Sequence, residues 1–356
     1  MNNIMTNIGP TVTFNETDTT IAYPPGVGGK PVIVIGSDSG LTAGTVYQFS
    51  SPAEAISACT SNSTLLNAIL QIFEEGGQYI QTDSLGIDTV YAIALPTTPQ
   101  PSDYTDALTL AESVAAKVEV YPALSNTTIL GYLATHLSDL AATGDVRVSV
   151  VTVADDTIGD METEVANLTS DRIVIKENPD TMALAAAKIA CTPYDIDPAK
   201  GAYRSTPTIL TWTRTELETM VSNCISPDWK GPDGPEPYMF VTPAFKLVSG
   251  VRLTSGLLHH RLNMDQHIEQ IYNKAQKHLK DNNTQNARNL IEQDVSGYLD
   301  IEMKDNKIES YVVNVDLDPD NVFGIIISGY IGILGAIYSI NINMTMNPPT
   351  GTIGGV

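Results

Sequence analysis

The chain of 356 residues carries a formal net charge of −22, with 19 basic and 41 acidic residues. A charge of this size repels nucleic acids and anionic membrane surfaces, which disfavours both as partners, so we expect neither nucleic acid binding nor direct membrane insertion. The 42% hydrophobic content is that of a folded protein, and the length predicts two or three compact units rather than one.

Residues 1–29 are expected to form a polar N-terminal arm, because they are rich in Thr and Asn and end in the Pro-Gly cluster Pro24–Gly29. The arm lacks the basic and apolar pattern of a secretory signal. Residues 30–98 then predict a first α/β subdomain. Its expected strands, rich in Val and Ile, are Pro31–Ser37 and Thr89–Leu95.

Two helices are expected between these strands. Ser51, Pro52 and Glu54 predict a helix start, with a capping box and proline at the first helical position. A second helix is expected over Leu65–Phe73, and Gly76–Gly77 are expected to end it.

Residues 99–226 predict a second α/β subdomain, which follows the proline-rich connector Pro96–Pro101. Strand and helix patterns alternate here, as they do in a sheet covered by helices. The expected helices are Ala107–Ala116, Thr127–Ala142, Met161–Leu168 and Asp180–Cys191, and the expected strands are Lys117–Tyr121, Val146–Val153 and Arg172–Lys176.

Residues 227–340 predict a C-terminal α+β domain, and residues 341–356 a C-terminal arm rich in Pro, Gly and Thr. The expected elements of this domain are a loop over Pro227–Pro237, a strand at Met239–Val241, two helices between Met264 and Lys304, and strands over Lys307–Leu317 and Val322–Met346. The predicted fold class is therefore multidomain α/β and α+β. A helix-covered mixed sheet precedes the C-terminal domain, and extended arms lie at both ends.

The uncharged run Val322–Ile342 leaves a membrane span open as an alternative, because its length is near that of a spanning helix. Four glycines interrupt the run, and Asn341 and Asn343 alternate with Ile and Met near its end. These features favour buried strands and a turn.

No catalytic, cofactor-binding or metal-ligating residue is predicted. Gly26–Lys30 lacks the glycine spacing of a phosphate-binding loop, and Pro31 stands where Ser or Thr is required. The cysteines Cys59, Cys191 and Cys224 are odd in number and widely spaced, which disfavours a disulfide framework and favours reduced, cytosolic synthesis.

The charged and histidine residues also form no pattern typical of a metal or catalytic site. His259, His260, Asp265 and His267 are interpreted as an exposed polar helix entry, because Asp265 and His267 would diverge on a helix. The carboxylate pairs at 74–75 and 155–156 are interpreted as solvated charges, because adjacent side chains on regular elements point apart.

The helix expected from Met264 to Lys280 has two distinct faces at 100° per residue. One face is apolar and contains Met264, Ile268, Ile271, Ala275 and Leu279. The opposite face is basic and contains Lys274, Lys277 and Lys280. The simpler interpretation of this basic face is a solvated surface balanced by Asp265, Glu269 and Asp281, and it remains open.

The order of short motifs along the chain resembles that of contractile tail-sheath proteins of phages, R-type bacteriocins and related injection systems. At the front, the segment Pro25-Gly26-Val27 leads to the strand Val32–Gly36, the stretch Ser50–Ala55, the helix Leu66–Phe73 with Gly76–Gly77, and the strand Val90–Leu95. Further on, the matching segments are Ala185–Ala190, Asp195–Gly201, Ser205–Pro207, Gly250–Thr254, Arg261–Leu262, Asn282–Asn283 and Asn306–Ile308. No single motif is diagnostic, and the shared order carries the resemblance.

The resemblance implies a structural subunit and no enzyme. Such a subunit polymerises helically around an inner tail tube by exchanging strands with its neighbours, and it contracts to drive the tube through a target envelope. The implied partners are further copies of the chain, the inner tube protein, and baseplate and tail-terminator proteins. The implied location is cytoplasmic assembly followed by a virion tail or an extracellular contractile particle.

The same resemblance implies two sets of contact residues. The strand-forming arm residues are Ile21, Ala22, Tyr23, Ile340, Ile342, Met344 and Met346. The tube-contact residues of the two-faced helix are Gln270, Lys274, Lys277 and Lys280. Alternatives that stay open are a membrane-anchored or S-layer-like surface protein, an α/β enzyme of unknown chemistry, a static tube or baseplate component, and ordinary frayed termini in place of arms.

Overall fold

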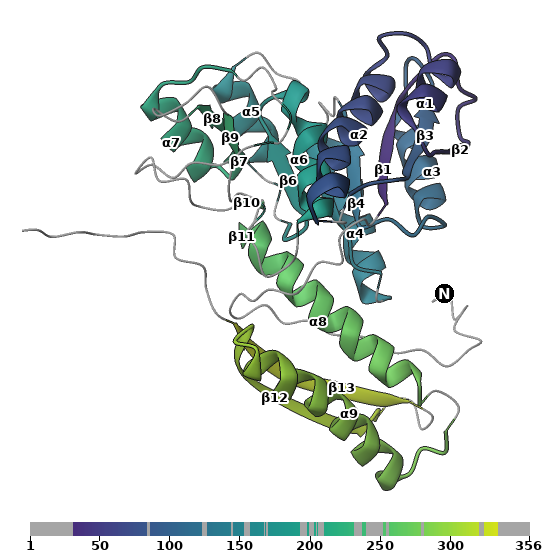
Figure 1. Ribbon diagram of the computed structural model, residues 1–356, viewed down its shortest axis with the longest axis vertical. Helices are drawn as coiled ribbons and strands as arrows, with labels where there is room; N and C mark the ends of the chain where they lie inside the picture. The colour runs from purple at the N-terminus through teal and green to yellow at the C-terminus, as the bar shows by residue number, and fades with distance from the viewer. Residues whose placement is uncertain are drawn as a thin grey trace, which may run out of the picture.

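The structure is a computed structural model, which describes residues 31–83, 86–122, 127–143, 145–152, 157–166, 168, 170–192, 198, 203, 205, 210–230, 237–239, 252–253, 256–278, 281–319 and 324–333. Within these residues, a nine-stranded sheet lies between two layers of helices, and a long helix leads from it to a separate hairpin (Figure 1). The strands of the sheet are β1 (Val32–Ser37), β2 (Val46–Phe49), β3 (Val90–Leu95), β4 (Val118–Tyr121), β5 (Val148–Thr152), β6 (Ile173–Lys176), β7 (Ile225–Ser226), β10 (Arg252–Leu253) and β11 (Gly256–Leu257).

The centre of the sheet is parallel and its margins are antiparallel. The strand order is β11-β10-β6-β5-β4-β1-β3-β2, and β7 pairs with β6 outside this path. Strand β1 lies between β3 and β4 and is parallel to both, with Val32 opposite Val90 and Val118. Buried parallel strands are covered on both faces, and this explains the nearly unbroken Val and Ile runs that predicted them.

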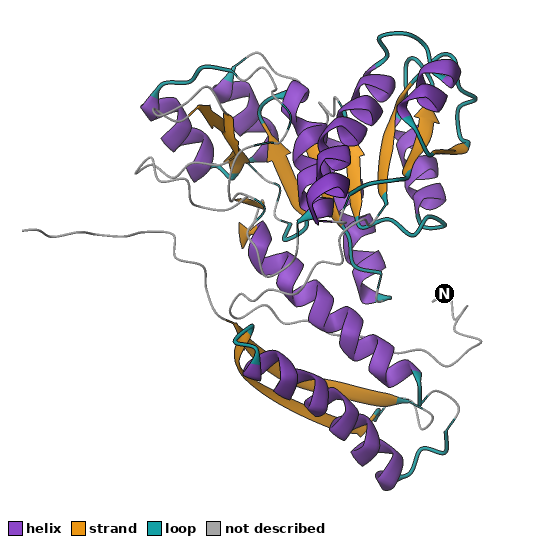
Figure 2. Ribbon diagram, viewed as in Figure 1, coloured by secondary structure: helices purple, strands orange, loops and turns teal. Residues whose placement is uncertain are grey.

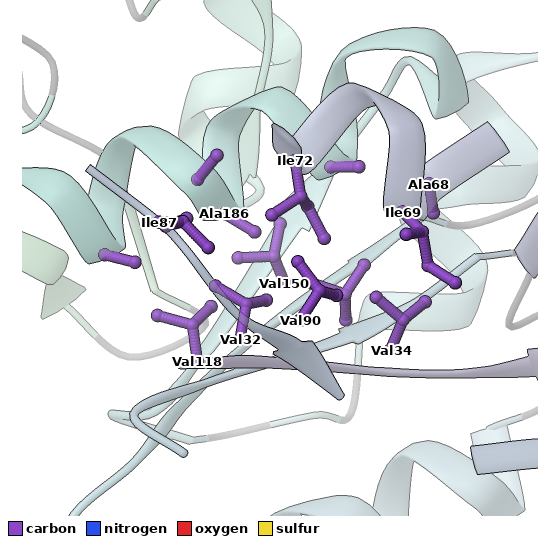
Figure 3. Packing of buried hydrophobic residues seen from close by; sticks show 14 of the residues in the cluster. Val32, Val34, Ala68, Ile69, Ile72, Ile87, Val90, Val118, Val150 and Ala186 are labelled. Carbon is purple, nitrogen blue, oxygen red and sulfur yellow. The ribbon is translucent and has the colours of Figure 1, made fainter. Parts of the chain in front are cut away.

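The helices cover both faces of this sheet (Figure 2). They are α1 (Pro52–Ala58), α2 (Thr64–Asp83), α3 (Pro101–Ala111), α4 (Thr127–Ala142), α5 (Ile158–Val165), α6 (Pro179–Cys191) and α7 (Arg214–Ser222). One apolar cluster joins α2 and α6 to the sheet, and there Ile72 and Ala186 lie over Val90 and Val150 (Figure 3). A second cluster joins α3, α4, α5 and α7 to the other face.

The first helix begins as its sequence predicts. Ser51 is the N-cap, its hydroxyl accepts a hydrogen bond from the Glu54 backbone N–H, and Pro52 is the first helical residue. The Glu54 carboxylate accepts from the backbone N–H of Ser50, one residue before the position expected in a capping box.

The prediction that Gly76–Gly77 end the second helix is wrong, because α2 continues to Asp83. A Cβ atom on Gly76 would lie 2.9 Å from Cβ of Ile87, so this glycine allows close packing inside a helix. The helix expected over Ala107–Ala116 is also displaced. Helix α3 begins at Pro101, where proline again occupies the first helical turn, and it ends at Ala111.

The elements beyond the sheet form a smaller unit. Helix α8 (Leu258–Gln276) leads to α9 (Gln285–Lys304), which packs on a two-stranded sheet of β12 (Ile308–Leu317) and β13 (Ile325–Ile333) (Figure 1). We call the nine-stranded sheet, its helices and the small hairpin β8 (Asp228–Lys230) and β9 (Pro237–Met239) the sheet lobe. We call α9, β12, β13 and α8 from Ile268 onward the hairpin lobe.

The first part of the proposed membrane span is an extended strand, because β13 covers residues 325–333. Within the described residues, no helix has both the length and the apolar character that crossing a bilayer requires. Strands from three of the expected domains, 30–98, 99–226 and 227–340, take part in the nine-stranded sheet. The domain boundaries stay a prediction, because strand pairing does not show which parts fold or move as units.

Candidate functional site

Helix α8 connects the two lobes, and ion pairs hold its first half against the sheet lobe. The Asp265 carboxylate binds two guanidinium groups, with 2.7 Å to Nη1 of Arg172 and 2.9 Å to Nε of Arg261. Arg261 also lies 2.6 Å from the Asp171 carboxylate. Burial alone would raise the pKa of Asp265, but the two arginines outweigh it and hold this pKa below its ordinary value.

A further ion pair lies one turn along the helix. Nζ of Lys117, just before β4, lies 3.1 Å from the Glu269 carboxylate, and both side chains are partly exposed. Arg261, Asp265 and Glu269 are spaced by four residues, so they share one face of α8. The charged side chains on this face therefore contact two different strand entries of the sheet lobe.

The interpretation of residues 259–267 as an exposed polar helix entry is wrong. His259 and Asp265 are 6% exposed and His267 is fully buried. Nδ1 of His267 lies 2.8 Å from the Tyr298 hydroxyl of α9. Burial, with a smaller effect of Lys307, lowers the pKa of His267 to about 3. In the described part of the chain, no group of His, Cys, Asp or Glu side chains is arranged to hold a metal ion.

The second half of α8 has the predicted apolar face. Ile268, Ile271 and Ala275 are buried, and the last two belong to a small apolar cluster with α9, β12 and β13. Met264, expected on this face, is half-buried. Leu279 and Lys280 lie outside the described residues, so the predictions for them stay untested.

The basic face of α8 is not balanced by the acids considered for that role. Asp265 binds Arg172 and Arg261, Glu269 binds Lys117, and Asp281 lies 3.5 Å from His278. Neither Lys274, which is half-buried, nor Lys277, which is exposed, forms an ion pair with another described residue. Gln270 beside them is half-buried. Within the described part of the chain, the charges of these two lysines thus have no ionic partner.

The hairpin presents one covered and one open face. Residues Tyr311, Val313, Val315, Ile325, Ile327 and Ile331 point toward α9 and pack against the small apolar cluster. Alternate residues point away from it, and the directly paired Val312 and Tyr330 are 40% and 58% exposed. Because this sheet has only two strands among the described residues, each strand has one edge without a partner strand.

The strands approach closely at Gly329. A Cβ atom there would overlap the carbonyl oxygen of Val312 and lie 2.8 Å from its carbonyl carbon. Glycine is therefore required by this contact between β12 and β13.

A buried charge network lies at the carboxyl end of β6, a position where open α/β sheets often bind ligands. Nζ of Lys176 donates to the Ser226 carbonyl at 2.8 Å and to the Asp228 carboxylate at 2.7 Å. The Asp228 carboxylate also accepts from the hydroxyls of Thr181 and Tyr203. These contacts fasten β8 and α6 to the end of β6.

Glu177, next to this network, has the kind of perturbed pKa that can mark an active site. It is 1% exposed and accepts from the backbone N–H of Asp228 at 2.8 Å. Burial raises its pKa to about 7, with Lys176 opposing and Asp228 adding to that shift. Burial within a network that joins three structural elements is sufficient to account for this shift.

Two more buried acids have structural partners that the sequence did not predict. Glu75 was interpreted as a solvated charge, which is wrong, because it is fully buried and accepts from the backbone N–H and hydroxyl of Ser205, each at 2.8 Å. Glu119 of β4 binds Arg147 at 3.1 Å and His136 at 3.2 Å. Asp155 and Asp156 lie outside the described residues.

The predicted arm residues and the Gly26–Lys30 segment cannot be compared with the structure. The arm residues Ile21, Ala22, Tyr23, Ile340, Ile342, Met344 and Met346 all lie outside the described residues.

Comparison with solved structures identifies the fold. No protein-family model matches the sequence, and no curated protein does. The structure is similar to the helical sheath of the anti-feeding prophage in its contracted state, with a TM-score of 0.68 and 14% identity, over 96% of this chain and 100% of that one. It is also similar to the sheath of an extracellular contractile injection system, PVC, in its contracted state, with a TM-score of 0.67 and 11% identity, over 96% and 99% of the two chains.

A third similar structure is the sheath tail protein from Listeria innocua, with a TM-score of 0.64 and 11% identity, over 87% of this chain and 93% of that chain. At these identities the comparison establishes a shared fold. The chain therefore has the fold of contractile sheath proteins.

Proposed function

We propose that the chain is a structural subunit of a contractile tail sheath. It polymerises helically around an inner tube, is assembled in the cytoplasm, and acts in a virion tail or an extracellular contractile particle. The observation that carries this proposal is the shared fold, which extends over 96% of this chain and the full length of an anti-feeding prophage sheath subunit. The support is strong because both lobes, and not the common α/β sheet alone, take part in a match of that extent.

Subunits join by strand exchange at the hairpin. A two-stranded sheet is marginally stable alone, and this one has, within the described residues, an open edge on each strand and exposed Val312, Ile326 and Tyr330 on its outer face. Segments around Ile21–Tyr23 and Ile340–Met346 of neighbouring subunits add to these edges. Backbone hydrogen bonds then connect subunits while the linkers beside them bend, so connections survive a large change in subunit orientation.

The tube contact is made by the basic face of α8. Lys274 and Lys277 have no ionic partner among the described residues, and an acidic tube surface would provide one. Exposed ion pairs contribute about 0–1 kcal/mol each, so such contacts hold the tube but release it during contraction. Contraction is driven by the larger contact area between subunits in the shortened state, without a nucleotide.

The test is to express the full chain alone and image it by negative-stain electron microscopy, where we expect wide hollow cylinders or rings. Removing residues 341–356 should leave soluble monomers with an unchanged circular dichroism spectrum. The matched control replaces the same residues by a Gly-Ser sequence of equal length, which keeps the chain length but not the strand pattern, and it should also give monomers.

Polymers that persist after both changes would exclude strand exchange by the C-terminal arm. A wild-type chain that stays monomeric at high concentration, or that requires detergent, would contradict the sheath proposal itself and favour the surface-protein alternative.

A further inference from the structure

Helix α8 is attached to the sheet lobe in two physically different ways. Leu258 and Leu262 at its start pack on the apolar cluster between α2, α6 and the sheet. Arg261, Asp265 and Glu269 form a charged stripe along its next turns, and their partners Asp171, Arg172 and Lys117 belong to the entries of β6 and β4. Figure 1 shows α8 leading away from the sheet toward the hairpin.

The two kinds of attachment respond differently to rotation of the helix. Apolar side chains can slide over one another with a small change in buried area. The Asp265 carboxylate cannot, because it is nearly buried and a rotation of the helix would separate it from the buried guanidinium of Arg172, and Arg261 from Asp171. The charged stripe therefore permits one helix orientation and penalises those near it.

We propose that these six residues form an interlobe latch, which fixes the angle between the sheet lobe and the hairpin lobe within one subunit. The latch consists of Lys117, Asp171, Arg172, Arg261, Asp265 and Glu269. The latch holds α8 in a fixed orientation relative to the sheet lobe, so a force on the hairpin lobe rotates both lobes together. The inference concerns a single chain and does not depend on polymerisation.

The latch has an inner and an outer part. Arg172, Arg261 and Asp265 are at most 6% exposed and hold the angle. The Lys117–Glu269 pair is about a quarter exposed on each side chain, with exposures of 24% and 28%, so dissolved salt screens it. Disrupting the outer pair should therefore loosen the angle without leaving a fully buried charge.

The test measures the distance between the lobes by double electron–electron resonance. Spin labels are placed on cysteines introduced at Ser102 in α3 and Gln293 in α9, both exposed. Cys224 is replaced by Asn, which tolerates the positive φ of 64° there. Labelled chains are diluted into an excess of unlabelled chain, so that only distances within one subunit are recorded.

Four variants separate the latch from general effects of charge. Asp265→Asn and the pair Lys117→Gln with Glu269→Gln should broaden the distance distribution or move its maximum. The exchanged pair Lys117→Glu with Glu269→Lys should keep it narrow, because the ion pair is retained. Glu309→Gln, on an exposed carboxylate of β12 outside the latch, is the control for loss of one negative charge and should change nothing.

Folding is checked by circular dichroism, since Asp265→Asn changes a buried group. If that variant unfolds, the partly exposed Lys117–Glu269 pair still tests the latch. A narrow, unchanged distance distribution in the folded Lys117→Gln and Glu269→Gln variant would overturn the proposal. So would equal broadening in the exchanged pair or in the Glu309→Gln control.

Discussion

The sheet lobe and the hairpin lobe differ in how completely they bury their apolar residues. Among the described residues, the large apolar side chains that are exposed in the sheet lobe are Ile56, Tyr132 and Leu210. Those exposed in the much smaller hairpin lobe are Leu290, Ile301, Met303, Val312, Leu317, Ile326 and Tyr330. The larger lobe is thus closed, and the smaller lobe leaves much of its apolar surface uncovered.

This difference follows from the number of layers in each lobe. The sheet lobe has helices on both faces of its sheet, so every strand of its centre is buried. The hairpin lobe has one helix layer on one face, because α9 and α8 both contribute to the same small apolar cluster. Exposed apolar surface of this kind often marks a site of contact with another protein, and the proposed assembly would supply the missing layer.

The largest expected effect is a loss of stability that is confined to the hairpin. Gly329→Ala places a methyl group against the backbone of Val312, so we expect a loss of about 2–4 kcal/mol in the local unfolding free energy of the hairpin. The matched control, Gly297→Ala in α9, meets nothing within 4 Å and should stabilise that exposed helix by about 0.4–1 kcal/mol. Hydrogen exchange resolved by segment measures both.

Loss of protection in the sheet lobe upon Gly329→Ala would contradict the separation of the two lobes. Equal changes in local unfolding free energy upon the two substitutions would show that a side chain at position 329 does not clash with Val312.

Acidity should shift stability in opposite directions through Glu177 and His267. Burial raises the pKa of Glu177 from 4.5 to about 7, so the folded chain keeps a proton that the unfolded chain releases. The contribution of Glu177 to the free energy of unfolding is fully present below pH 4.5. It falls by about 1.4 kcal/mol per pH unit as the pH rises toward 7. Glu177→Gln should remove this loss, as denaturant titrations at several pH values would show.

His267 affects the pH dependence of stability in the opposite direction. Its pKa falls from 6.5 to about 3, so between these values the unfolded chain takes up a proton and the folded chain does not. Stability therefore declines as pH falls below 6.5, and His259, whose pKa is lowered to about 4, adds to this decline. His267→Gln should flatten the acid side of the profile, and an unchanged profile would show that His267 is hydrated.

A smaller effect is expected from exposed apolar residues. Tyr330→Ser in the hairpin and Ile56→Ser in the sheet lobe change side chains of similar exposure, 58% and 57%. Both should alter the stability of the isolated chain by about 0.5 kcal/mol or less. Only Tyr330→Ser should raise the protein concentration at which polymers form, as measured by sedimentation. Equal effects on polymer formation would weaken the contrast between the lobes.

The smallest expected effect concerns the tube. Lys277→Glu should weaken assembly on a tail tube, because each exposed ion pair contributes about 0–1 kcal/mol, and should leave tube-free polymers unchanged. Lys304→Glu changes another exposed lysine of the same lobe and is the control for net charge. Electron microscopy of mixtures with the tube protein measures attachment. Equal loss with both variants would assign the effect to overall charge.

Much of the fold was predictable, because local patterns specify most of its elements. Helix α4 covers the predicted Thr127–Ala142, and strand β12 begins one residue after its expected start. The continuation of α2 through Gly76 was not predictable, since Ile87 fills the space beside this glycine only in the folded chain. Helix α7 was missed although its start has a capping box at Thr213 and Glu216, a signal present in the sequence.

The candidate site was predictable only in part. The apolar face with Ile268, Ile271 and Ala275 has a helical period and could be read from the sequence. The burial of Asp265 could not, because its partner Arg172 is far away in the sequence, although the spacing of Arg261, Asp265 and Glu269 marked them as one face. A charged residue whose partner is distant in the sequence is therefore interpreted as solvated, because only the folded chain brings the two together.

The position of β10 has a consequence for synthesis. Strand β10 pairs antiparallel with β6 through Leu253 and Val174, and β7 pairs with the end of β6, so β6 is synthesised well before both segments that cover this edge of it. An uncovered strand edge on a nascent chain can pair with a neighbouring nascent chain. The net charge of −22 favours repulsion between such chains and so opposes pairing of their exposed strand edges.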